Sequence, residues 1–312
     1  MNNFKFSNDN KRYHTWNYYL RNRYNSKVYK VPLDGGFTCP NRDGSVSYGG
    51  CSFCSERGSG DFVFESQSII EQYLNGKEVM MKKWPNAKVI PYFQSYSNTY
   101  GSLDKIKSCI DPFLKLDEVV AISIGTRPDC LEDFKLNYLD KCSKEKDIWI
   151  ELGLQSANDN TTSKLNRGHD FNCLKECIER IKKTNCKICI HIINGLPNEN
   201  KQDMIDTAKK VNDLNIDAIK IHMLHIIKNT ALANEYLLNP FKIITREEYV
   251  DIVCEQLKVL NPNIVIQRLT GDANKDDLIT PKWTIKKTIV LNEIDKTMSK
   301  NNWFQGINLS TK

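Results

Sequence analysis

The sequence predicts an α/β fold, a partial (β/α)6 TIM-like barrel with a short C-terminal α/β extension. Two observations predict it: apolar runs recur along the chain, and a stretch with helical spacing lies between each pair of them. Near-continuous apolar strands that alternate with helices are typical of a parallel sheet covered by helices. The strand candidates are residues 28–34, 87–95, 119–126, 148–155, 187–194 and 218–226. Six such units fit an open barrel, whose functional residues lie at the C-terminal ends of the strands.

By pattern the chain divides into a basic, aromatic N-terminal segment (residues 1–27), the barrel units (28–230) and a C-terminal extension (231–312). In the extension a helix is predicted across residues 245–260, because a Thr with a Glu three residues later marks its start as a capping box. The extension also holds an extra predicted strand and a last predicted helix, at residues 263–269 and 283–298. We expect this segment to pack on the barrel.

The composition excludes some classes of protein. Hydrophobic residues make up 40% of the 312 residues, which is enough for a core, and no apolar run is long enough to cross a membrane. The first residues lack the apolar core of a signal peptide. Eleven cysteines, an odd number scattered through the chain, argue against a disulfide framework and favour reduced thiols and metal ligation. We therefore expect a cytoplasmic protein without a membrane partner.

The N-terminal segment concentrates positive charge and aromatic rings. Six basic residues and no acidic residue lie between Lys11 and Lys30. The aromatic residues among them are Tyr13, Trp16, Tyr18, Tyr19, Tyr24 and Tyr29. Cations that neutralise phosphates beside rings that stack on bases are typical of an RNA-contacting surface. The alternative is an amphipathic helix whose rings pack on the barrel and whose cations are solvated.

Three cysteines near the N-terminus, Cys39, Cys51 and Cys54, carry the strongest functional signal. The Cys-x2-Cys pair alone is compatible with a zinc knuckle or a redox dithiol. Three thiolates without a fourth fit a [4Fe–4S] cluster better, because three ligated irons leave the fourth iron open to a substrate or cofactor. Phe53, just before the last cysteine, is placed to shield such a cluster from water.

At these residues the chain resembles a known family. Cys-x11-Cys-x2-Cys with an aromatic before the last cysteine is similar to the cluster loop of the radical S-adenosylmethionine (SAM) superfamily, whose commoner spacing is Cys-x3-Cys-x2-Cys. The longer first gap resembles the branch of the YhcC/YtqA-type proteins and, more distantly, the catalytic subunit of Elongator. Further stretches agree in order between about residues 12 and 290. They are residues 123–129, 151–156, 166–169, 195–197 and 267–272.

The resemblance implies a [4Fe–4S] cluster held by the three cysteines, with SAM bound at the open iron. In this family an electron from the cluster cleaves SAM to methionine and a 5′-deoxyadenosyl radical, which takes a hydrogen atom from the substrate. The likeness to Elongator implies tRNA as a partner. An electron donor such as flavodoxin or ferredoxin is implied as well.

The resemblance also places contacts to SAM. Gln155, at the end of the fourth strand, and Arg167, twelve residues on, match a pair that contacts the ribose and the methionine carboxylate. A guanidinium is well suited to a carboxylate, and the alternative for Arg167 is a salt bridge at a helix end. Gly195 and Pro197 close the fifth strand, where the family places backbone contacts to adenine.

Two departures from the family pattern concern SAM. The glycine-rich element after the second strand is replaced by a polar stretch that begins with Gln94 and Ser95. Its backbone carbonyls are compatible with the same role. Elongator-like relatives carry a Glu where this chain has Gly125, so one polar contact to SAM is missing or is supplied from elsewhere.

Four further residues are candidate catalytic residues. Arg127 and Asp129 follow the third strand, at the end where barrel sites lie. Lys220 and His222 share one face of the sixth strand, and we expect them to line the barrel interior. The alternative for a lone His in a strand is a structural role.

A second series of cysteines has metal-ligand spacing. It consists of Cys173, Cys177, Cys186 and Cys189. The first two lie one turn apart on a predicted helix and the last lies within an apolar strand. We interpret the series as buried core thiols rather than as a second metal site.

Three functions are compatible with these observations. The leading hypothesis is a radical SAM enzyme that remodels a modified uridine side chain at the tRNA wobble position. A second is a radical SAM oxidase or transferase that acts on a small molecule, with the N-terminal cations as solvated surface. A third is a non-catalytic RNA-binding module stabilised by zinc or a cluster, which the ordered strand-end motifs disfavour.

Overall fold

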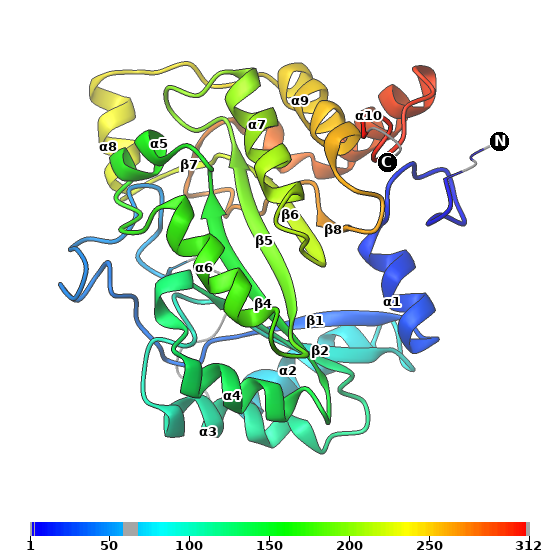
Figure 1. The fold of residues 1–312 in the computed structure, drawn as a ribbon. Helices are drawn as coiled ribbons and strands as arrows, with labels where there is room; N and C mark the ends of the chain where they lie inside the picture. Colours follow the sequence, from blue (N-terminus) through cyan, green and yellow to red (C-terminus); the bar gives the residue numbers. More distant parts are fainter. Residues whose placement is uncertain (1, 3, 59–67, 310–312) are drawn as a thin grey trace.

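The computed structural model describes residues 2, 4–58 and 68–309 and contains a curved parallel sheet covered by helices (Figure 1). Residues 1 and 3 of the predicted N-terminal segment and residues 310–312 of the predicted extension therefore lie outside the described residues. Over the described residues, one seven-stranded sheet has the order β1-β2-β3-β4-β5-β6-β8 with parallel pairings. Its strands are β1 (Val28–Leu33), β2 (Lys88–Phe93), β3 (Ala121–Thr126), β4 (Asp147–Gln155), β5 (Lys187–Asn194), β6 (Ala218–Met223) and β8 (Val265–Arg268). The predicted partial barrel is confirmed.

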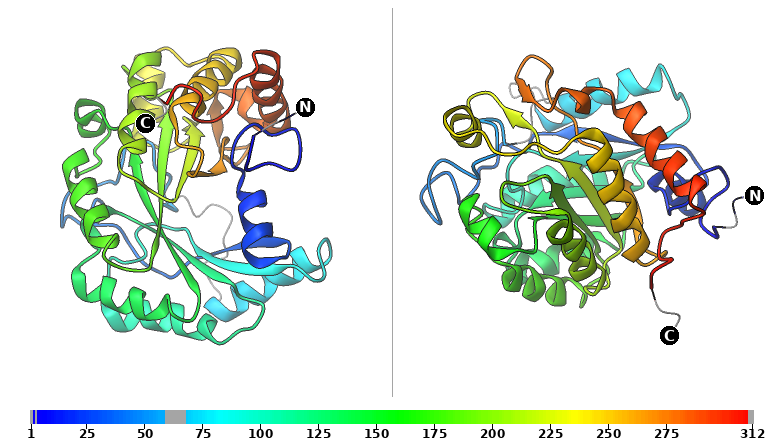
Figure 2. Two further views of the ribbon diagram at one scale, coloured as in Figure 1. Left: turned by 45° about the vertical axis from the view of Figure 1, so that its right-hand side comes forward. Right: turned by 90° about the horizontal axis from the view of Figure 1, so that it is seen from above.

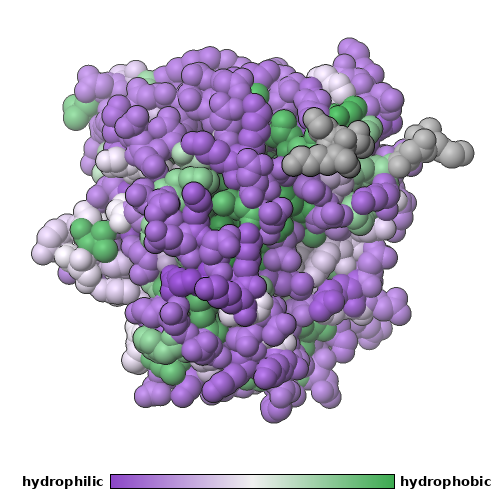
Figure 3. Space-filling view, in the orientation of Figure 1, coloured by the Kyte–Doolittle hydropathy of each residue, from purple (hydrophilic) through white to green (hydrophobic). Residues whose placement is uncertain are grey.

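Helices cover the outer side of the sheet, as both views of Figure 2 show. The main core lies between this side and the helices, where apolar strand residues such as Ile122 and Ile150 are fully buried. The helices are α1 (Trp16–Tyr24), α2 (Ile69–Met81), α3 (Leu103–Leu114), α4 (Asp133–Cys142), α5 (Asp159–Lys164), α6 (Phe171–Ile181), α7 (Lys201–Asn212), α8 (Ala231–Leu238), α9 (Arg246–Val259) and α10 (Lys287–Lys300). Hydrophilic residues dominate the face seen in Figure 3. No helix among the described residues is long and apolar enough to span a membrane.

The C-terminal extension follows its local sequence signals closely. Thr245 accepts a hydrogen bond from the Glu248 amide, and the Glu248 carboxylate accepts one from the Thr245 amide, so the predicted capping box starts α9. The predicted extra strand is β8, which joins the main sheet beside β6. Where one last helix was expected, a 3₁₀ turn at Lys282–Ile285 precedes α10.

The sixth predicted strand is shorter than expected. β6 ends at Met223, and the next apolar residues form β7 (Ile226–Ile227), which pairs antiparallel with β9 (Leu278–Thr280). The physical reason is a change of packing partner. Leu224 and Ile226 leave the barrel core and enter a separate apolar cluster.

Helix α1 closes the N-terminal end of the barrel. The rings of Trp16 and Tyr19 stack 5.3 Å apart, and both meet the buried ring of Trp149 edge-on, at 5.0 and 5.7 Å. Leu20 joins the same cluster, which one residue from each strand of the sheet completes: Val28, Ile90, Ala121, Trp149, Cys189, Ala218 and Val265. These rings therefore face the protein. The Trp16 and Tyr19 rings thus pack on the barrel, as the amphipathic-helix alternative expected, while an RNA contact by the segment stays a prediction.

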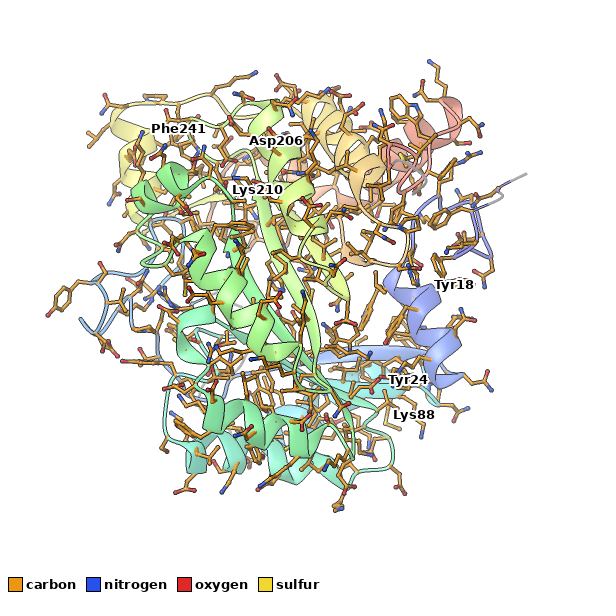
Figure 4. All side chains as sticks on the ribbon, viewed as in Figure 1. Tyr18, Tyr24, Lys88, Asp206, Lys210 and Phe241 are labelled. Atoms are coloured by element: carbon orange, nitrogen blue, oxygen red, sulfur yellow. The ribbon has the colours of Figure 1, made fainter. Side chains whose placement is uncertain are left out.

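The cations of the N-terminal segment also have partners in the protein. Arg23 makes two hydrogen bonds to Asp147, at 2.6 and 2.8 Å, and Tyr24, labelled in Figure 4, donates its hydroxyl to the same carboxylate at 2.5 Å. Lys11 pairs with Asp295 on α10. Asp147 is the first residue of β4, so α1 is fixed to the end of the barrel opposite the strand C-termini.

We expect Trp149→Ala to lower the free energy of unfolding by about 3–5 kcal/mol, because it leaves a large cavity beneath the rings of α1. Urea unfolding followed by circular dichroism measures this loss. Leu238→Ala is the matched control, because Leu238 is 81% exposed on α8, and we expect a change below about 0.5 kcal/mol. A similar small change for Trp149→Ala would contradict the closing role of α1.

Candidate functional site

The C-terminal ends of the strands and the cysteine loop enclose a cavity of about 720 Å³. Most residues that the sequence singled out line its wall: Cys39, Cys51, Phe53, Cys54, Gln94, Arg127, Gln155, Arg167, Lys220 and His222. Four others are not among the described residues that line it: Ser95, Asp129, Gly195 and Pro197. The fold therefore brings the motifs from five strands to one mouth, as expected for a barrel site.

The cysteine loop is tied to the barrel by its own backbone. The Ser52 amide donates to the Leu165 carbonyl at 3.0 Å, and the Leu232 amide donates to the Ser52 carbonyl at 2.8 Å. Phe53 packs on the apolar cluster that contains Leu165 and Leu232. Phe53 thus fastens the loop to the C-terminal segment on one side and lines the cavity on the other.

The three cysteine sulfurs of the loop do not lie as close together as the ligand atoms of one bound ion. Burial raises the pKa of Cys39, and it raises the pKa of Cys54 to about 11, so a metal must displace both protons on binding. Arg167 Nη1 donates to the Cys51 sulfur at 3.2 Å. One zinc ion would hold thiolates roughly 3.8 Å apart. Among the described residues, these sulfurs are not a group whose ligand atoms all lie within 4.8 Å.

Gln155 and Arg167 come together over Gly153. Arg167 Nη2 donates to the Gly153 carbonyl at 2.5 Å. A Cβ on residue 153 would lie 2.9 Å from Gln155 Nε2 and 3.2 Å from Arg167 Nη2, so a side chain there would displace the ends of both. Gln155 has a φ of 74°, a left-handed conformation that costs energy for a residue with a Cβ and is found preferentially at functional sites. Arg167 has no ion pair with a described carboxylate, contrary to the salt-bridge alternative.

Arg127 and Asp129 form a brace behind the loop. Two Arg127 nitrogens donate to the Asp129 carboxylate at 2.8 and 2.6 Å, and Nη1 donates to the Arg167 carbonyl at 2.7 Å. Arg127 is buried and lines the cavity, whereas Asp129 stands behind it. The pair holds the backbone that carries Arg167.

The polar stretch after β2 is organised by Asn98. Its Nδ2 donates to the carbonyls of Phe93, Ser95 and Gly125 at 3.1, 3.0 and 2.9 Å. The Ser95 carbonyl is thus already engaged, and the described members of the stretch that line the cavity are Gln94 and Tyr96. A Cβ on residue 125 would lie 3.1 Å from the Phe93 carbonyl oxygen, which explains why glycine rather than glutamate stands there.

Gly195 has a φ of 88°, and a Cβ there would lie 3.0 Å from Ile244. Its amide contacts the Met204 sulfur at 3.2 Å. The turn at 195–197 therefore packs against the segment before α9. Its backbone contact to adenine stays a prediction.

Sequence reasoning did not predict that polar side chains form a layer inside the barrel, just above the α1 rings that close its N-terminal end. We call this layer the polar tier. The tier consists of Lys30, Tyr92, Glu151, His191, Lys220 and Gln267, each from a different strand, and all of them line the cavity. Glu151, 1% exposed, accepts hydrogen bonds from Lys30 at 2.5 Å, from His191 at 2.9 Å and from Lys220. The sequence signal that could have indicated the tier is a charged residue in the middle of an apolar strand, Lys30 in β1 and Glu151 in β4, because such a residue needs a buried partner.

The protonation states of the tier follow from burial and pairing. Burial alone would raise the pKa of Glu151, but Lys220 and Lys30 hold it well below 4.5. Burial lowers the pKa of Lys220 to about 8 and that of His191 to about 4. At neutral pH Glu151 is therefore a carboxylate, Lys220 is largely an ammonium and His191 is a neutral imidazole.

The second cysteine series does not assemble. Cys177 and Cys186 are buried in the core between sheet and helices, and Cys189 faces the barrel interior. Among the described residues, the group with single-ion geometry is Glu151, Cys189 and His191, whose carboxylate is already shared by two ammonium groups. The structure agrees with core thiols.

Comparison with known families decides the class. The model of the radical SAM superfamily matches residues 39–211, from the first cysteine through α7, and that of the radical SAM C-terminal domain matches residues 216–300. The chain belongs to the radical SAM superfamily. It is a radical SAM enzyme, and the cofactors of this superfamily are a [4Fe–4S] cluster and SAM. The residues of the mouth fit that pair.

Individual relatives show which branch of the superfamily this radical SAM enzyme resembles. The uncharacterized protein YtqA of Bacillus subtilis is 43% identical over 98% of this chain and 95% of its own length. Protein YhcC of Escherichia coli is 31% identical over 90% of this chain and 91% of its own length. The predicted YhcC/YtqA-type branch is confirmed.

More distant relatives share the fold. The archaeal Methanocaldococcus infernus Elp3 superposes with a TM-score of 0.67 over 90% of this chain and 64% of its own, at 17% identity. A tRNA uridine(34) acetyltransferase of the same organism is 24% identical over 49% of this chain and 29% of its own length.

Proposed function

We propose that this radical SAM enzyme acts on the side chain of a modified wobble uridine of tRNA. The similarity to a tRNA uridine(34) acetyltransferase carries the proposal, because the relative is named for chemistry at that nucleotide. The likeness to Elp3 supports the same fold for the shared part. Elongator complex protein 3 of Schizosaccharomyces pombe matches 49% of this chain as well, at 27% identity.

The residues of the mouth have distinct proposed roles. Cys39, Cys51 and Cys54 would hold the cluster, and Gln155 and Arg167 would orient SAM beside it. When bound, the two cofactors supply reductive cleavage of SAM to a 5′-deoxyadenosyl radical. Arg127, through its bond to the Arg167 carbonyl, would hold that guanidinium in place.

Two further proposals concern the cellular setting. The cluster needs a one-electron donor, and a small redox protein such as flavodoxin or ferredoxin fits that requirement. A cytoplasmic location is supported by the state of the cysteines, because all eleven are free thiols in the structure.

We propose that the RNA contact lies at the cavity mouth rather than on α1. Arg21 and its neighbours lie at the closed end, so RNA bound there would not present a base to the cysteines. Lys164 and Lys228 are exposed beside segments that hold the cysteine loop: Lys164 precedes Leu165, and Lys228 lies four residues before Leu232. We propose these cations as phosphate contacts.

The first test is anaerobic reconstitution with iron and sulfide, followed by dithionite and SAM, with and without bulk tRNA. Formation of 5′-deoxyadenosine that rises with tRNA is the expected result. Cleavage indifferent to tRNA would retain the radical enzyme and remove this substrate.

A charge-reversal pair locates the RNA surface. We expect Lys164→Glu with Lys228→Glu to weaken tRNA binding by about tenfold or more at low salt, because two phosphate contacts are lost and two repulsions gained. Arg21→Glu with Lys144→Glu makes the same charge change at the closed end and is the matched control. Filter binding across a salt series measures both. Equal weakening by the two pairs would contradict a mouth-directed site.

The alternative substrate class is a small molecule. The inward rings of α1 favour it, because they remove the stacking surface expected for RNA. A cavity of about 720 Å³ closed at one end is also within the range of small-molecule sites. Competition by total RNA separates the two classes, since a small-molecule enzyme would not bind it. Family membership leaves no support for the non-catalytic RNA-binding module.

A further inference from the structure

The polar tier in the barrel floor has more hydrogen-bond donors than its own members use. An ammonium group has three N–H bonds. Lys30 donates to Glu151 and to Gln267 Oε1 at 2.9 Å, and Lys220 donates to Glu151 and to the Tyr92 hydroxyl at 3.3 Å. Each lysine therefore keeps one N–H bond for a further acceptor.

Neighbouring polar atoms are also unused. Gln267 Nε2 and His222 Nε2 are buried without a hydrogen-bond partner in the described protein, and so is the hydroxyl of Ser123. Ser123 lies on β3 between Ala121 and Gly125, which both face the barrel interior. A buried donor without a partner costs about 1–3 kcal/mol, so Gln267 Nε2 favours a ligand that supplies an acceptor.

The carboxylate of the tier cannot serve a cationic ligand. Both Glu151 oxygens already accept from ammonium groups, and His191 donates to one of them as well. Burial keeps His191 and His222 neutral by lowering their pKa values. The tier thus has one positive charge in excess while Lys220 is protonated, and the hydrogen-bonding capacity that its lysines and Gln267 Nε2 leave unused consists of N–H donors.

The position of the tier restricts how a ligand reaches it. Trp16, Tyr19 and Trp149 close the floor beneath it, and the cavity opens above it toward the cysteines. Gly125 and Gly153 line the space between the tier and the mouth and put no side chain into it. A group that reaches the tier must therefore pass the cluster side first.

We propose that the polar tier is a binding site for an oxyanion group of the substrate, held by Lys30, Lys220 and the Gln267 amide. Glu151 is its positioning residue, since it aims both ammonium groups. Lys220, 6% exposed, makes this a built site rather than a surface patch. The inference goes beyond the proposed function, because it holds for a carboxylate or a phosphate and for a nucleotide or a free small molecule alike.

The test uses the reconstituted, SAM-bound enzyme without RNA, so that SAM occupies the open iron. Acetate, inorganic phosphate and the neutral acetamide are the probes, and isothermal titration calorimetry at constant ionic strength measures their binding. We expect saturable binding of acetate or phosphate at millimolar concentration and none of acetamide. Acetate preferred over phosphate assigns a carboxylate, and the reverse assigns a phosphate.

Two variants tie binding to the tier. Lys220→Met removes one ammonium, and Gln267→Glu keeps the shape of the side chain while it replaces free donors by a second carboxylate for Lys30. Each is expected to weaken oxyanion binding by at least about tenfold, whereas Lys141→Met, an exposed lysine of α4, leaves it unchanged. Gln267→Glu keeps the test valid if Lys220→Met does not fold.

Acetamide binding equal to that of acetate, binding unaffected by Gln267→Glu, or no saturable binding would each overturn the proposal. The readout involves neither tRNA nor SAM cleavage. Failure of this inference and failure of the proposed function are therefore distinguishable.

Discussion

Replacement of any one of Cys39, Cys51 or Cys54 by Ala is expected to abolish the formation of 5′-deoxyadenosine from SAM. Two thiolates cannot hold three irons of a cluster, so the variant loses the group that delivers the electron. Iron content, the visible absorbance of the cluster and 5′-deoxyadenosine after dithionite reduction measure the effect together. All three readouts should fall in parallel.

Cys177→Ala and Cys173→Ala are the matched controls, because both residues lie on α6, outside the cavity wall. Each should keep its iron and its activity, although loss of the buried Cys177 side chain lowers stability slightly. Full iron content in a Cys51→Ala variant would contradict the assignment of the loop. Iron loss in the Cys173 variant would instead revive the second metal site.

Glu151→Gln is expected to lower the free energy of unfolding by about 3–5 kcal/mol, the usual cost of removing one partner of a buried ion pair. The reason is that the two lysine side chains keep their positive charges after the carboxylate is removed. Lys30 and Lys220 would stay side by side in the barrel without a carboxylate between them. Urea unfolding with circular dichroism detection measures the loss at neutral pH.

A double variant separates lost pairing from general disruption. Adding Lys220→Met to Glu151→Gln removes one of the stranded ammonium groups, and we expect it to restore more than half of the lost stability. The control pair is Asp251→Asn with Lys201→Met, an ion pair with both side chains about half exposed, where each change should cost less than about 1 kcal/mol. Additive losses for Glu151 and Lys220 would show that the two groups are not coupled.

Local signals allowed much of the fold to be predicted. The capping box at Thr245 depends on residues three positions apart, and strand–helix alternation depends on each segment's own pattern. The cysteine loop needed no tertiary information either, because its spacing alone matches a family. Gln155 and Arg167 were found through the same resemblance. The sequence did not show that both side chains lie against Gly153, because that contact is visible only in the folded structure.

Features that depend on distant parts of the chain could not be predicted. The rings of α1 alternate with cations in a pattern that suits RNA stacking and barrel packing equally. The choice is made by Trp149, more than a hundred residues away, which offers them a buried surface. The polar tier was missed for the same reason. Its members are single polar residues on six strands, and only the register of the sheet shows that they meet.

The position of α1 has a consequence for how the chain folds during synthesis. Thr15 bridges to Ile266 beside β8, the His14 amide donates to Gln305 at 2.8 Å, and α1 emerges from the ribosome long before either partner exists. At 5–20 residues per second, the roughly 250 residues between Thr15 and Ile266 take about 13–50 s to make. For that time the apolar face of α1 lacks the strand that completes its binding surface. The helix that closes the barrel is thus synthesised first, but its binding surface is completed last. A molecular chaperone that binds exposed aromatic segments has this interval in which to act.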